Sequence, residues 1–517
     1  MHGPVPLLHD YLIHSAQQFG GKVALVCGDQ RVAYREIDAQ SNALAHHLAA
    51  AGVARGDRVM IFADNSVETV ISFWAALKAN AVVCIVNPLT KAGKLDYLLK
   101  DCRPAAFITD KRLHSVYNEP VLNCPSLRRV IVSGPIDDPD LAELPHAVRW
   151  SAAVAGPSSE PPARRCIDID LAAIVYTSGS TGDAKGVMLT HRNMLTACTS
   201  IAAYLGVRED DVILNVLPLA FDYGLYQMIM AFRMGARLVL ERSFAFPAQI
   251  LRRVAEERIT GFPGVPTIFS TLFGLESLKE FDLSSIRYVT NTGAALPVKH
   301  LAALQQVFPH ARIFSMYGLT ECKRCTYLPP DDLNRKPSSV GIAIPNTEMW
   351  IVDEADQRVG PGVVGQLVIR GATVMKGYWG KPEATARRLK PGPLPGEQVL
   401  YTGDYCWMDE EGYLYFVGRS DEIIKSRGEK VAPKEVENVL MNLPGVKEAA
   451  VIGIPDELLG QAIKAFVVAE QGTTISEKQL QRECQGQLEN FMVPKSIVIV
   501  SSLPRTETGK LNKRALS

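Results

Sequence analysis

The sequence lacks the features that would place the protein in or across a membrane. No run in its 517 residues approaches the roughly 18 consecutive apolar residues that a spanning helix requires. The N-terminus has no basic segment followed by an apolar core, so we recognise no signal peptide. Charge of one sign is not in excess either, since 55 lysines and arginines balance 55 aspartates and glutamates. We therefore expect a cytoplasmic protein with no membrane span and no general attraction for nucleic acid.

Clustered cysteine is also missing. The ten cysteines are scattered, and only Cys322 and Cys325 form a Cys-x-x-Cys pair, without a second pair or histidines at metal spacing. Disulfide-stapled scaffolds are much smaller than this chain, whose 47% hydrophobic and 21% charged residues are ordinary for a globular protein. We expect reduced thiols and neither a zinc site nor a redox motif.

The hydrophobic patterning that is present predicts an α/β fold. Helical stretches alternate with short apolar strands between residues 30 and 130, and a second βα pattern follows a Pro- and Ser-rich connector at 156–166. Such alternation is typical of parallel sheets covered by helices. From about residue 340 strands and turns predominate, and after Asp421 a compact βα set follows.

The stretch YTSGSTGDAKG, from Tyr176 to Gly186, combines three glycines, four hydroxyl side chains and a lysine directly after an apolar run. Glycine has no Cβ, so its backbone N–H groups are open to an anion such as phosphate. Lys185 does not directly follow the second glycine, which excludes a standard P-loop, and a G-x-G-x-x-G fingerprint is absent. Composition alone leaves a phosphate loop and an ordinary solvated loop both open.

Four further stretches place polar groups at the ends of apolar strands. They are SMYGLTE (315–321), YTGDY (401–405), GRSDEIIKSRGEKVAPKEVE (418–437) and PRTETGKLNK (504–513). They supply an aromatic stacking face, a possible Mg²⁺ ligand, a carboxylate suited to ribose hydroxyls and a lysine on a glycine turn. Each one alone could be a turn, a helix start or a solvated surface.

Taken in order, these five motifs resemble those of the adenylate-forming superfamily, which includes acyl-CoA synthetases, adenylation domains of peptide synthetases and beetle luciferases. The resemblance extends over nearly the whole chain. It implies that the glycine-rich loop holds the β- and γ-phosphates of ATP while a substrate carboxylate attacks the α-phosphate. The products are acyl-AMP and pyrophosphate, and a thiol then displaces AMP.

The resemblance also assigns roles to individual residues. The residues of the phosphate loop are Thr177, Ser178, Gly179, Ser180, Thr181, Gly182 and Lys185. Tyr317 would lie against adenine, with Gly293 and Ala294 lining the same site.

Four catalytic and ribose-binding roles follow in the same way. Thr320 would hold the α-phosphate and Glu321 the Mg²⁺, while Asp404 would bind the ribose hydroxyls with help from Arg419. Lys510 would bridge the substrate carboxylate and the phosphate, which stabilises charge that grows in the transition state.

The resemblance fixes the expected domains as well. We expect a large N-terminal domain, residues 1–418, made of βα subdomains plus a β-rich subdomain, and a small mobile α+β C-terminal domain, residues 422–517. The hinge would lie at 419–421, at Asp421. A swing about it would remove Lys510 and bring in the loop around Gly428, where the pantetheine thiol enters.

The substrate is open between two classes. Phe221 stands where many family members carry a histidine, and Asp222 falls where amino-acid-activating domains place the carboxylate that pairs with the substrate ammonium. Arg324 should enter the same pocket and could neutralise Asp222, because an unpaired buried charge is costly. An amino acid and an ordinary or polar carboxylic acid therefore both remain, with a slight preference for the acyl substrate.

The acceptor is free coenzyme A or the phosphopantetheine arm of a carrier protein. The chain ends seven residues after Lys510, so we expect any carrier to be a separate protein. The predicted function is an ATP-dependent acid–thiol ligase like the acyl-CoA synthetases, and the alternative is an amino-acid-activating ligase that loads a separate carrier protein. Nothing in the sequence requires an oxygenase of the luciferase type. A non-catalytic nucleotide sensor is disfavoured because Lys185, Glu321, Asp404 and Lys510 are all present.

Overall fold

The computed structural model describes residues 6–156, 160–177, 184–293, 296–419, 422–426, 429–456, 459–488, 490–506 and 511–516. The chain divides into two compact units. The large unit comprises Met1–Glu348 and Ile369–Leu400, and the small unit comprises Met349–Val368 and Tyr401–Ser517. No helix among the described residues is both long and apolar enough to cross a bilayer.

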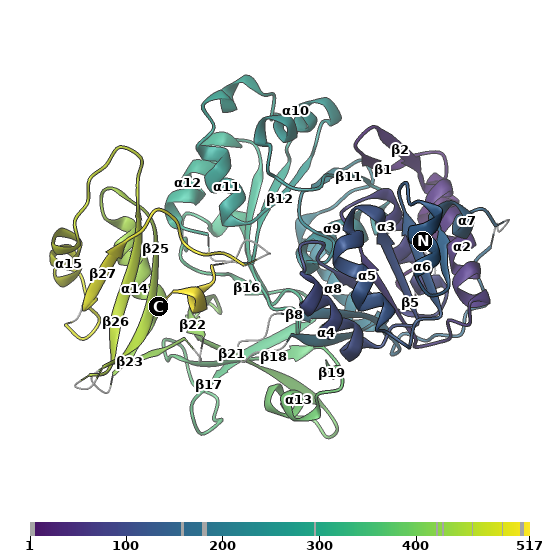
Figure 1. Ribbon diagram of the computed structural model, residues 1–517. Coiled ribbons are helices and arrows are strands. Elements are labelled where there is room, and N and C mark those ends of the chain that lie inside the picture. The colour runs from purple at the N-terminus through teal and green to yellow at the C-terminus, as the bar shows by residue number, and fades with distance from the viewer. Residues whose placement is uncertain are drawn as a thin grey trace. The chain divides into compact units, whose positions relative to one another are not determined.

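A nine-stranded sheet forms one half of the large unit (Figure 1). Its strands, in order across the sheet, are β16 (Ile342–Ala343), β15 (Thr326–Leu328), β14 (Arg312–Tyr317), β13 (Tyr288–Asn291), β12 (Gly261–Gly264), β10 (Val212–Asn215), β11 (Arg237–Leu240), β1 (Val23–Cys27) and β2 (Gln30–Ala33). The strands from β14 to β1 are parallel. The order of the chain reverses between β10 and β12, and the carboxyl ends of strands at such a reversal are where ligands bind in open α/β sheets.

An eight-stranded sheet forms the other half of the large unit. Its order is β19 (Gly377–Tyr378), β9 (Lys185–Thr190), β8 (Leu171–Thr177), β4 (Val82–Val86), β3 (Arg58–Phe62), β5 (Ala106–Asp110), β6 (Arg129–Ser133) and β7 (Ala147–Arg149). The strands from β8 to β7 are parallel, whereas β9 pairs antiparallel with both β8 and β19. The glycine-rich stretch is therefore the connection of the antiparallel pair β8–β9.

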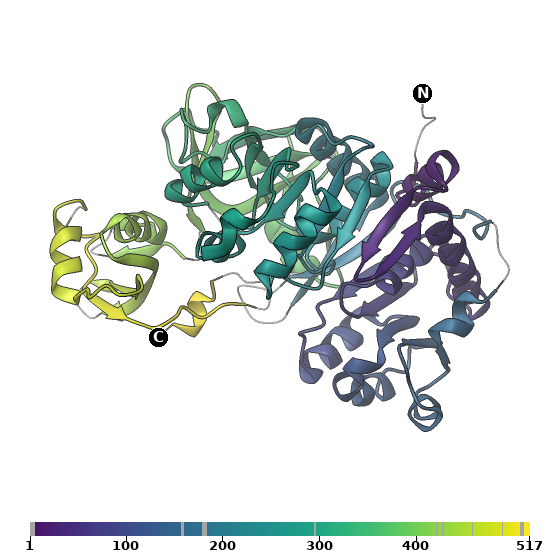
Figure 2. The same ribbon diagram turned by 90° about the horizontal axis from the view of Figure 1, so that it is seen from above.

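Helices cover both sheets, as Figures 1 and 2 show. Those of the large unit are α1 (Asp10–Phe19), α2 (Tyr34–Ala50), α3 (Val67–Lys78), α4 (Ala92–Cys102), α5 (His114–Leu122), α6 (Asp138–Glu143), α7 (Trp150–Val154), α8 (His191–Leu205), α9 (Asp222–Met234), α10 (Pro247–Glu257), α11 (Pro266–Phe273), α12 (Val298–Val307) and α13 (Pro382–Arg388). Helix α8 packs on β8 and β9, α9 packs on β10 and β11, and the two helices contact each other. They form a shared layer between the two sheets.

The core of this layer is aromatic. Trp74 of α3 and Phe232 of α9 are fully buried, with ring centroids 5.2 Å apart. Tyr34 packs edge-on against Phe232, and its hydroxyl donates to the carbonyl of Ala236 at 2.5 Å. Burying three large aromatic side chains contributes several kcal/mol, on the order of 2 kcal/mol each. This packing joins elements of both sheets into one body.

Two smaller sheets follow in the chain. One has the order β17 (Thr347–Val352), β18 (Gly365–Gly371), β21 (Gln398–Met408) and β20 (Leu389–Pro391), with β22 (Leu414–Arg419) paired to β21. The other has the order β24 (Glu429–Val431), β23 (Ile424–Ser426), β26 (Gly460–Ala469) and β25 (Val446–Asp456), with β27 (Ser496–Ile499) paired to β26. Helices α14 (Pro433–Asn442) and α15 (Glu477–Gln485) share an apolar core with this last sheet.

The expected fold class is confirmed: a large part built from βα units and a small α+β part. The expected bounds at 1–418 and 422–517 stay predictions, and residues 420 and 421 of the expected hinge lie outside the described residues.

A buried histidine predicts how stability depends on pH. His191 at the start of α8 is 1% exposed, and its Nδ1 accepts from the Leu8 amide at 3.1 Å. Burial lowers the pKa of His191 from 6.5 to about 4. Because the folded pKa lies below the unfolded one, its contribution to stability is complete above pH 6.5 and is lost as the pH falls towards 4. We predict a loss of about 3 kcal/mol over that window from this group.

Urea unfolding between pH 7 and 4 checks this prediction. His191→Gln keeps an acceptor for Leu8 without the titrating ring, so the fall in the free energy of unfolding should become shallower. His310→Gln, at an exposed histidine, serves as the control and should follow the parent curve. An equally steep fall in the His191→Gln variant would show that other groups cause the acid destabilisation.

Candidate active site

Helix α4 anchors both ends of the glycine-rich connection. Tyr176, near the end of β8, donates its hydroxyl to Asp101 Oδ2 at 2.6 Å, and Tyr97 donates to the carbonyl of Ala184, just before β9, at 3.0 Å. Thr177 and Lys185 face each other in the β8–β9 register. The expected phosphate-loop residues between these ends lie outside the described residues, namely Ser178, Gly179, Ser180, Thr181 and Gly182. Hydrogen bonds to helix α4 therefore hold the base of the hairpin on which these residues lie.

Gly186 follows Lys185 and is required by close packing. A Cβ at this position would lie 2.7 Å from Ile174 Cγ2 and 3.3 Å from Trp379 Cβ. The Gly186 carbonyl accepts from the Trp379 amide at 2.8 Å, which adds the segment after β19 to the hairpin. Glycine therefore serves the fold here by letting two strands approach.

Tyr378 of β19 connects two residues to which the sequence assigns separate tasks. The Lys185 ammonium lies over its ring, 5.6 Å from the centroid. Its hydroxyl donates to Glu321 Oε1 at 2.7 Å. Burial, and secondarily the Glu321 charge, raise the pKa of Tyr378, so the hydroxyl keeps its proton and acts as the donor. One side chain, Tyr378, thus contacts both Lys185, the expected phosphate-binding lysine, and Glu321, the expected Mg²⁺ ligand.

Glu321 lies in a tight loop between β14 and β15 that a glycine makes possible. A Cβ on Gly318 would lie 1.9 Å from the carbonyl oxygen of Lys323, so only glycine fits. Lys323 itself adopts a left-handed conformation with φ of 64°. The loop closes where the Cys325 amide donates to the carbonyl of Tyr317 at 2.9 Å. Thr320 and Glu321 thereby follow the carboxyl end of a parallel strand, where ligands bind in such sheets.

The expected adenine residues lie at neighbouring strand ends. Tyr317 ends β14, and Gly293, with φ of 86°, follows β13, the parallel neighbour of β14. Ala294 lies outside the described residues.

The expected ribose residues lie together in the small unit. Asp404 of β21 faces Arg419 of β22 in the strand register, with Arg419 Nε 3.9 Å from Asp404 Oδ1. Asp404 is 3% exposed, and its amide donates to Thr402 Oγ1. The preceding Gly403, inside β21, has φ of 73°, a left-handed backbone conformation that glycine adopts without strain.

The expected acid-pocket residues come together with one that sequence reasoning missed. Asp222 begins α9 and is 7% exposed, and its ionic partner is Lys323, with Nζ 3.8 Å from Oδ2. The proposed pairing with Arg324 is wrong: the Arg324 guanidinium lies instead over the ring of Tyr223, 4.7 Å from the centroid. Phe221, the residue before α9, also packs edge-on against Tyr223. Lys323 was missed because nothing in the sequence reveals its left-handed backbone.

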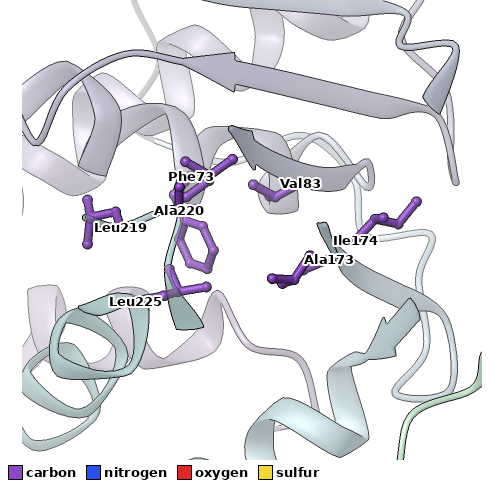
Figure 3. Close-up of a pocket in the computed structure, with 9 residues that line it drawn as sticks. Phe73, Val83, Ala173, Ile174, Leu219, Ala220 and Leu225 are labelled. Carbon is purple, nitrogen blue, oxygen red and sulfur yellow. The ribbon is translucent and has the colours of Figure 1, made fainter. Parts of the chain in front are cut away.

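A small apolar cavity lies between the residues on either side of Asp222 and strand β8 (Figure 3). Leu219, Ala220 and Leu225 face Ala173 and Val83 across it. Its volume of about 10 Å³ is at the lower limit for a single water molecule. The residues just before Asp222 and those of β8 therefore line one small apolar space.

The described residues on either side of the C-terminal motif pair with each other within the small unit. Arg505 and Leu511 form an isolated β-bridge, and the Asn512 amide donates to the carbonyl of Pro504 at 2.8 Å. Lys513 Nζ lies 2.7 Å from Glu437 Oε1, which ties the tail to α14. Lys510 lies outside the described residues. Asp421 and Gly428, in other parts of the chain, also lie outside them.

All ten cysteines are free thiols. Cys322 and Cys325 are fully buried in the β14–β15 loop, with their sulfur atoms 3.1 Å apart. A hydrogen bond between the two thiols, together with burial, raises the pKa of Cys322, so it is held as the neutral thiol.

Comparison with known proteins matches nearly the whole chain. A family model described as AMP-binding enzyme covers residues 12–379, and one described as AMP-binding enzyme C-terminal domain covers residues 435–510. The long-chain-fatty-acid–CoA ligase of Escherichia coli O157:H7 is 30% identical over 536 residues, which cover 98% of this chain and 94% of that protein. Surfactin synthase subunit 2 of Bacillus subtilis (strain 168) is 30% identical over 97% of this chain, but over 14% of its own length.

The solved structures give the same result. The crystal structure of ATP-bound MatB from Rhodopseudomonas palustris superposes with a TM-score of 0.88 at 29% identity, covering 98% of both chains. Together with the anchored hairpin and the Glu321 loop, these likenesses define an AMP-forming acid–thiol ligase of the acyl-CoA synthetase type. The chain belongs to the AMP-binding enzyme family.

The position of Tyr378 generates a prediction. Tyr378→Phe keeps the ring beneath Lys185 but removes the hydrogen bond that orients Glu321. Bonds to charged groups contribute about 1.5–3 kcal/mol, so we expect the Mg²⁺ concentration for half-maximal activity to rise about tenfold. Titration of pyrophosphate exchange with Mg²⁺ at saturating ATP measures this. Tyr415→Phe removes a similar hydroxyl–carboxylate bond, to Asp409, and should leave the titration unchanged. An unaltered midpoint in Tyr378→Phe would remove Tyr378 from this role.

Proposed function

We propose that this ligase activates a carboxylic acid with ATP and Mg²⁺ and passes the acyl group to the thiol of coenzyme A. The carboxylate oxygen attacks the α-phosphorus of ATP, and pyrophosphate leaves. The thiol then attacks the carbonyl carbon of acyl-AMP, and AMP leaves with the bonding electron pair. The observation that carries this proposal is the Lys185–Tyr378–Glu321 connection, which holds a phosphate-binding cation and a metal-binding carboxylate in one arrangement.

Nucleotide binding is proposed for three groups of residues. The glycine-rich connection, with Thr177 and Lys185 at its ends, binds the β- and γ-phosphates. Tyr317, Gly293 and Ala294 line the adenine site. Asp404, with Arg419 beside it, accepts the ribose hydroxyls. Burial lowers the pKa of Lys185, and the nearby cations Arg388 and Arg387 lower it further. This concentration of positive charge favours the binding of an anion.

Mg²⁺ fits the Glu321 carboxylate. Tyr378 donates to Oε1, so Oε2 remains available for a metal. The described residues contain no group of three or more His, Cys, Asp or Glu side chains that could hold a metal by itself. One carboxylate completed by substrate phosphates is a usual Mg²⁺ arrangement, in which the ion neutralises phosphate charge. Thr320, next to Glu321, is proposed to hold the α-phosphate.

The small C-terminal domain is proposed to move between the two half-reactions. Lys510 acts in the first, where it stabilises the charge that grows between carboxylate and phosphate. A swing about Asp421 then replaces it with the loop around Gly428, which admits the pantetheine thiol.

The alternative acceptor is the phosphopantetheine arm of a separate carrier protein, and the alternative substrate is an amino acid. The likeness to a segment of surfactin synthase subunit 2 supports both the carrier-protein acceptor and the amino-acid substrate as alternatives. The Asp222–Lys323 ion pair weighs against the amino acid, because the carboxylate that would receive an ammonium already has a cation. The ten free thiols support the proposed cytoplasmic location.

The first test separates the half-reactions. Lys510→Ala should reduce acyl-AMP formation by about 100-fold or more, as removal of a charge-stabilising group does. Thioester formation from supplied acyl-AMP and coenzyme A should be largely preserved, because Lys510 acts only in the first step. Pyrophosphate exchange and direct thioester assay measure the two steps. Equal losses in both would reject this division of roles.

The second test concerns ribose. Asp404→Ala removes an acceptor for two hydroxyls, and charge-assisted bonds of about 1.5–3 kcal/mol each predict a rise of about tenfold or more in the Kd for ATP. Calorimetric titration with ATP measures this. Glu410→Ala, at an exposed carboxylate of the same region, is the matched control. Unchanged ATP binding in Asp404→Ala would place the ribose elsewhere.

A further inference from the structure

Three charged side chains gather where ligands bind in sheets of this kind. Asp222 follows β10 and begins α9, whereas Lys323 and Arg324 lie in the loop after β14. Strands β10 and β14 run parallel within the sheet, so both segments leave it at its carboxyl edge. The chain order reverses beside β10, and the edge at such a reversal forms a ligand crevice. We call these three residues the charged cluster.

The charge of Asp222 is already balanced inside the cluster. Lys323 is 2% exposed, and its ammonium lies 3.8 Å from Asp222 Oδ2 and over the ring of Tyr226, 4.8 Å from the centroid. One buried anion and one buried cation therefore compensate each other.

Arg324 is left over from this balance. It is 5% exposed, and its Nε makes no hydrogen bond to the described residues. Its guanidinium stacks on Tyr223, whose own hydroxyl is bonded to Thr290 of β13. A ring face attracts a cation only weakly compared with a carboxylate. Among the described residues no carboxylate forms an ion pair with Arg324, so the charged cluster carries one uncompensated positive charge, which is costly in a buried place.

Glu321 does not supply the missing charge. It lies in the same loop, but its carboxylate accepts from Tyr378, and its proposed partner is Mg²⁺. An anion that arrives with a ligand is then the natural counter-ion for Arg324. The guanidinium fork suits a carboxylate in particular, because it can donate two parallel hydrogen bonds.

We propose that Arg324 makes this ligase select a carboxylic acid that bears a second anionic group, such as a dicarboxylic acid. One carboxylate reacts with ATP, and the other binds Arg324 at the edge of the nine-stranded sheet. This inference rests on the proposed function and names the substrate class of its acid pocket. Lys323 has a complementary role: its ion pair with Asp222 keeps that carboxylate from binding a substrate ammonium group.

Matched acids test the proposal with the full-length protein. Each pair has the same chain and differs at its far end: butanoate and succinate, hexanoate and adipate, octanoate and suberate. The monomethyl esters of the diacids and 6-aminohexanoate complete the panel. In pyrophosphate exchange we expect one diacid to exceed its monoacid partner in kcat/KM by about 30-fold or more, the worth of a charge-assisted bond. Its monomethyl ester should fall back to the monoacid level.

Variants connect this preference to the cluster. Arg324→Gln should reduce the ratio of diacid to monoacid activity about tenfold or more, and Arg324→Lys should retain part of it. Lys323→Met should instead raise the relative activity with 6-aminohexanoate, because Asp222 loses its cation. Arg312→Gln is the matched control, since Arg312 also lies over an aromatic ring, that of Phe314, but is exposed at the start of β14. Thermal unfolding of each variant shows whether it is folded.

Different outcomes would contradict the diacid preference and the proposed ligase function. Exchange with monoacids or amino acids in preference to every diacid would overturn the inference and leave the ligase function intact. A diacid preference that survives in folded Arg324→Gln would also overturn it. Exchange with no acid at all would refute the proposed function, and the inference with it.

Discussion

The turn at Gly318 is the constraint on which the site depends. A Cβ on Gly318 would lie only 1.9 Å from the carbonyl oxygen of Lys323, because the chain doubles back within a few residues of the end of β14. This turn directs Glu321 towards Tyr378 and brings Lys323 to Asp222. Any side chain at position 318 would displace both charged residues together, because they lie on the same short loop.

Around that turn, the large unit uses aromatic hydroxyls to fix groups that will carry charge. Tyr97 and Tyr176 hold the two ends of the glycine-rich connection, and Tyr378 orients Glu321. A tyrosine ring is stiff and its hydroxyl is a neutral donor, so it positions a carboxylate or a backbone carbonyl without adding charge. The charges themselves remain available for the proposed phosphate and Mg²⁺ contacts.

The charged cluster is the proposed source of this enzyme's substrate selectivity. The charged cluster sets two cations, Lys323 and Arg324, against one anion, Asp222. Because burial makes each unit of charge costly, the proposal needs only one additional cation to favour a substrate with a second anionic group. Selectivity by charge balance needs no change in the backbone.

The sequence by itself determined the fold class, the family and the order of the functional motifs, because hydrophobic periodicity and short glycine-containing motifs are local properties of the chain. It also placed Asp222 and Arg324 in one region. Only the tertiary structure decided which residues the charged side chains contact. Lys323, with its left-handed backbone, pairs with Asp222. Tyr378 donates to Glu321 from a strand 57 residues further along the chain. Such pairings depend on which chain segments become neighbours in space, and neither spacing nor composition encodes that.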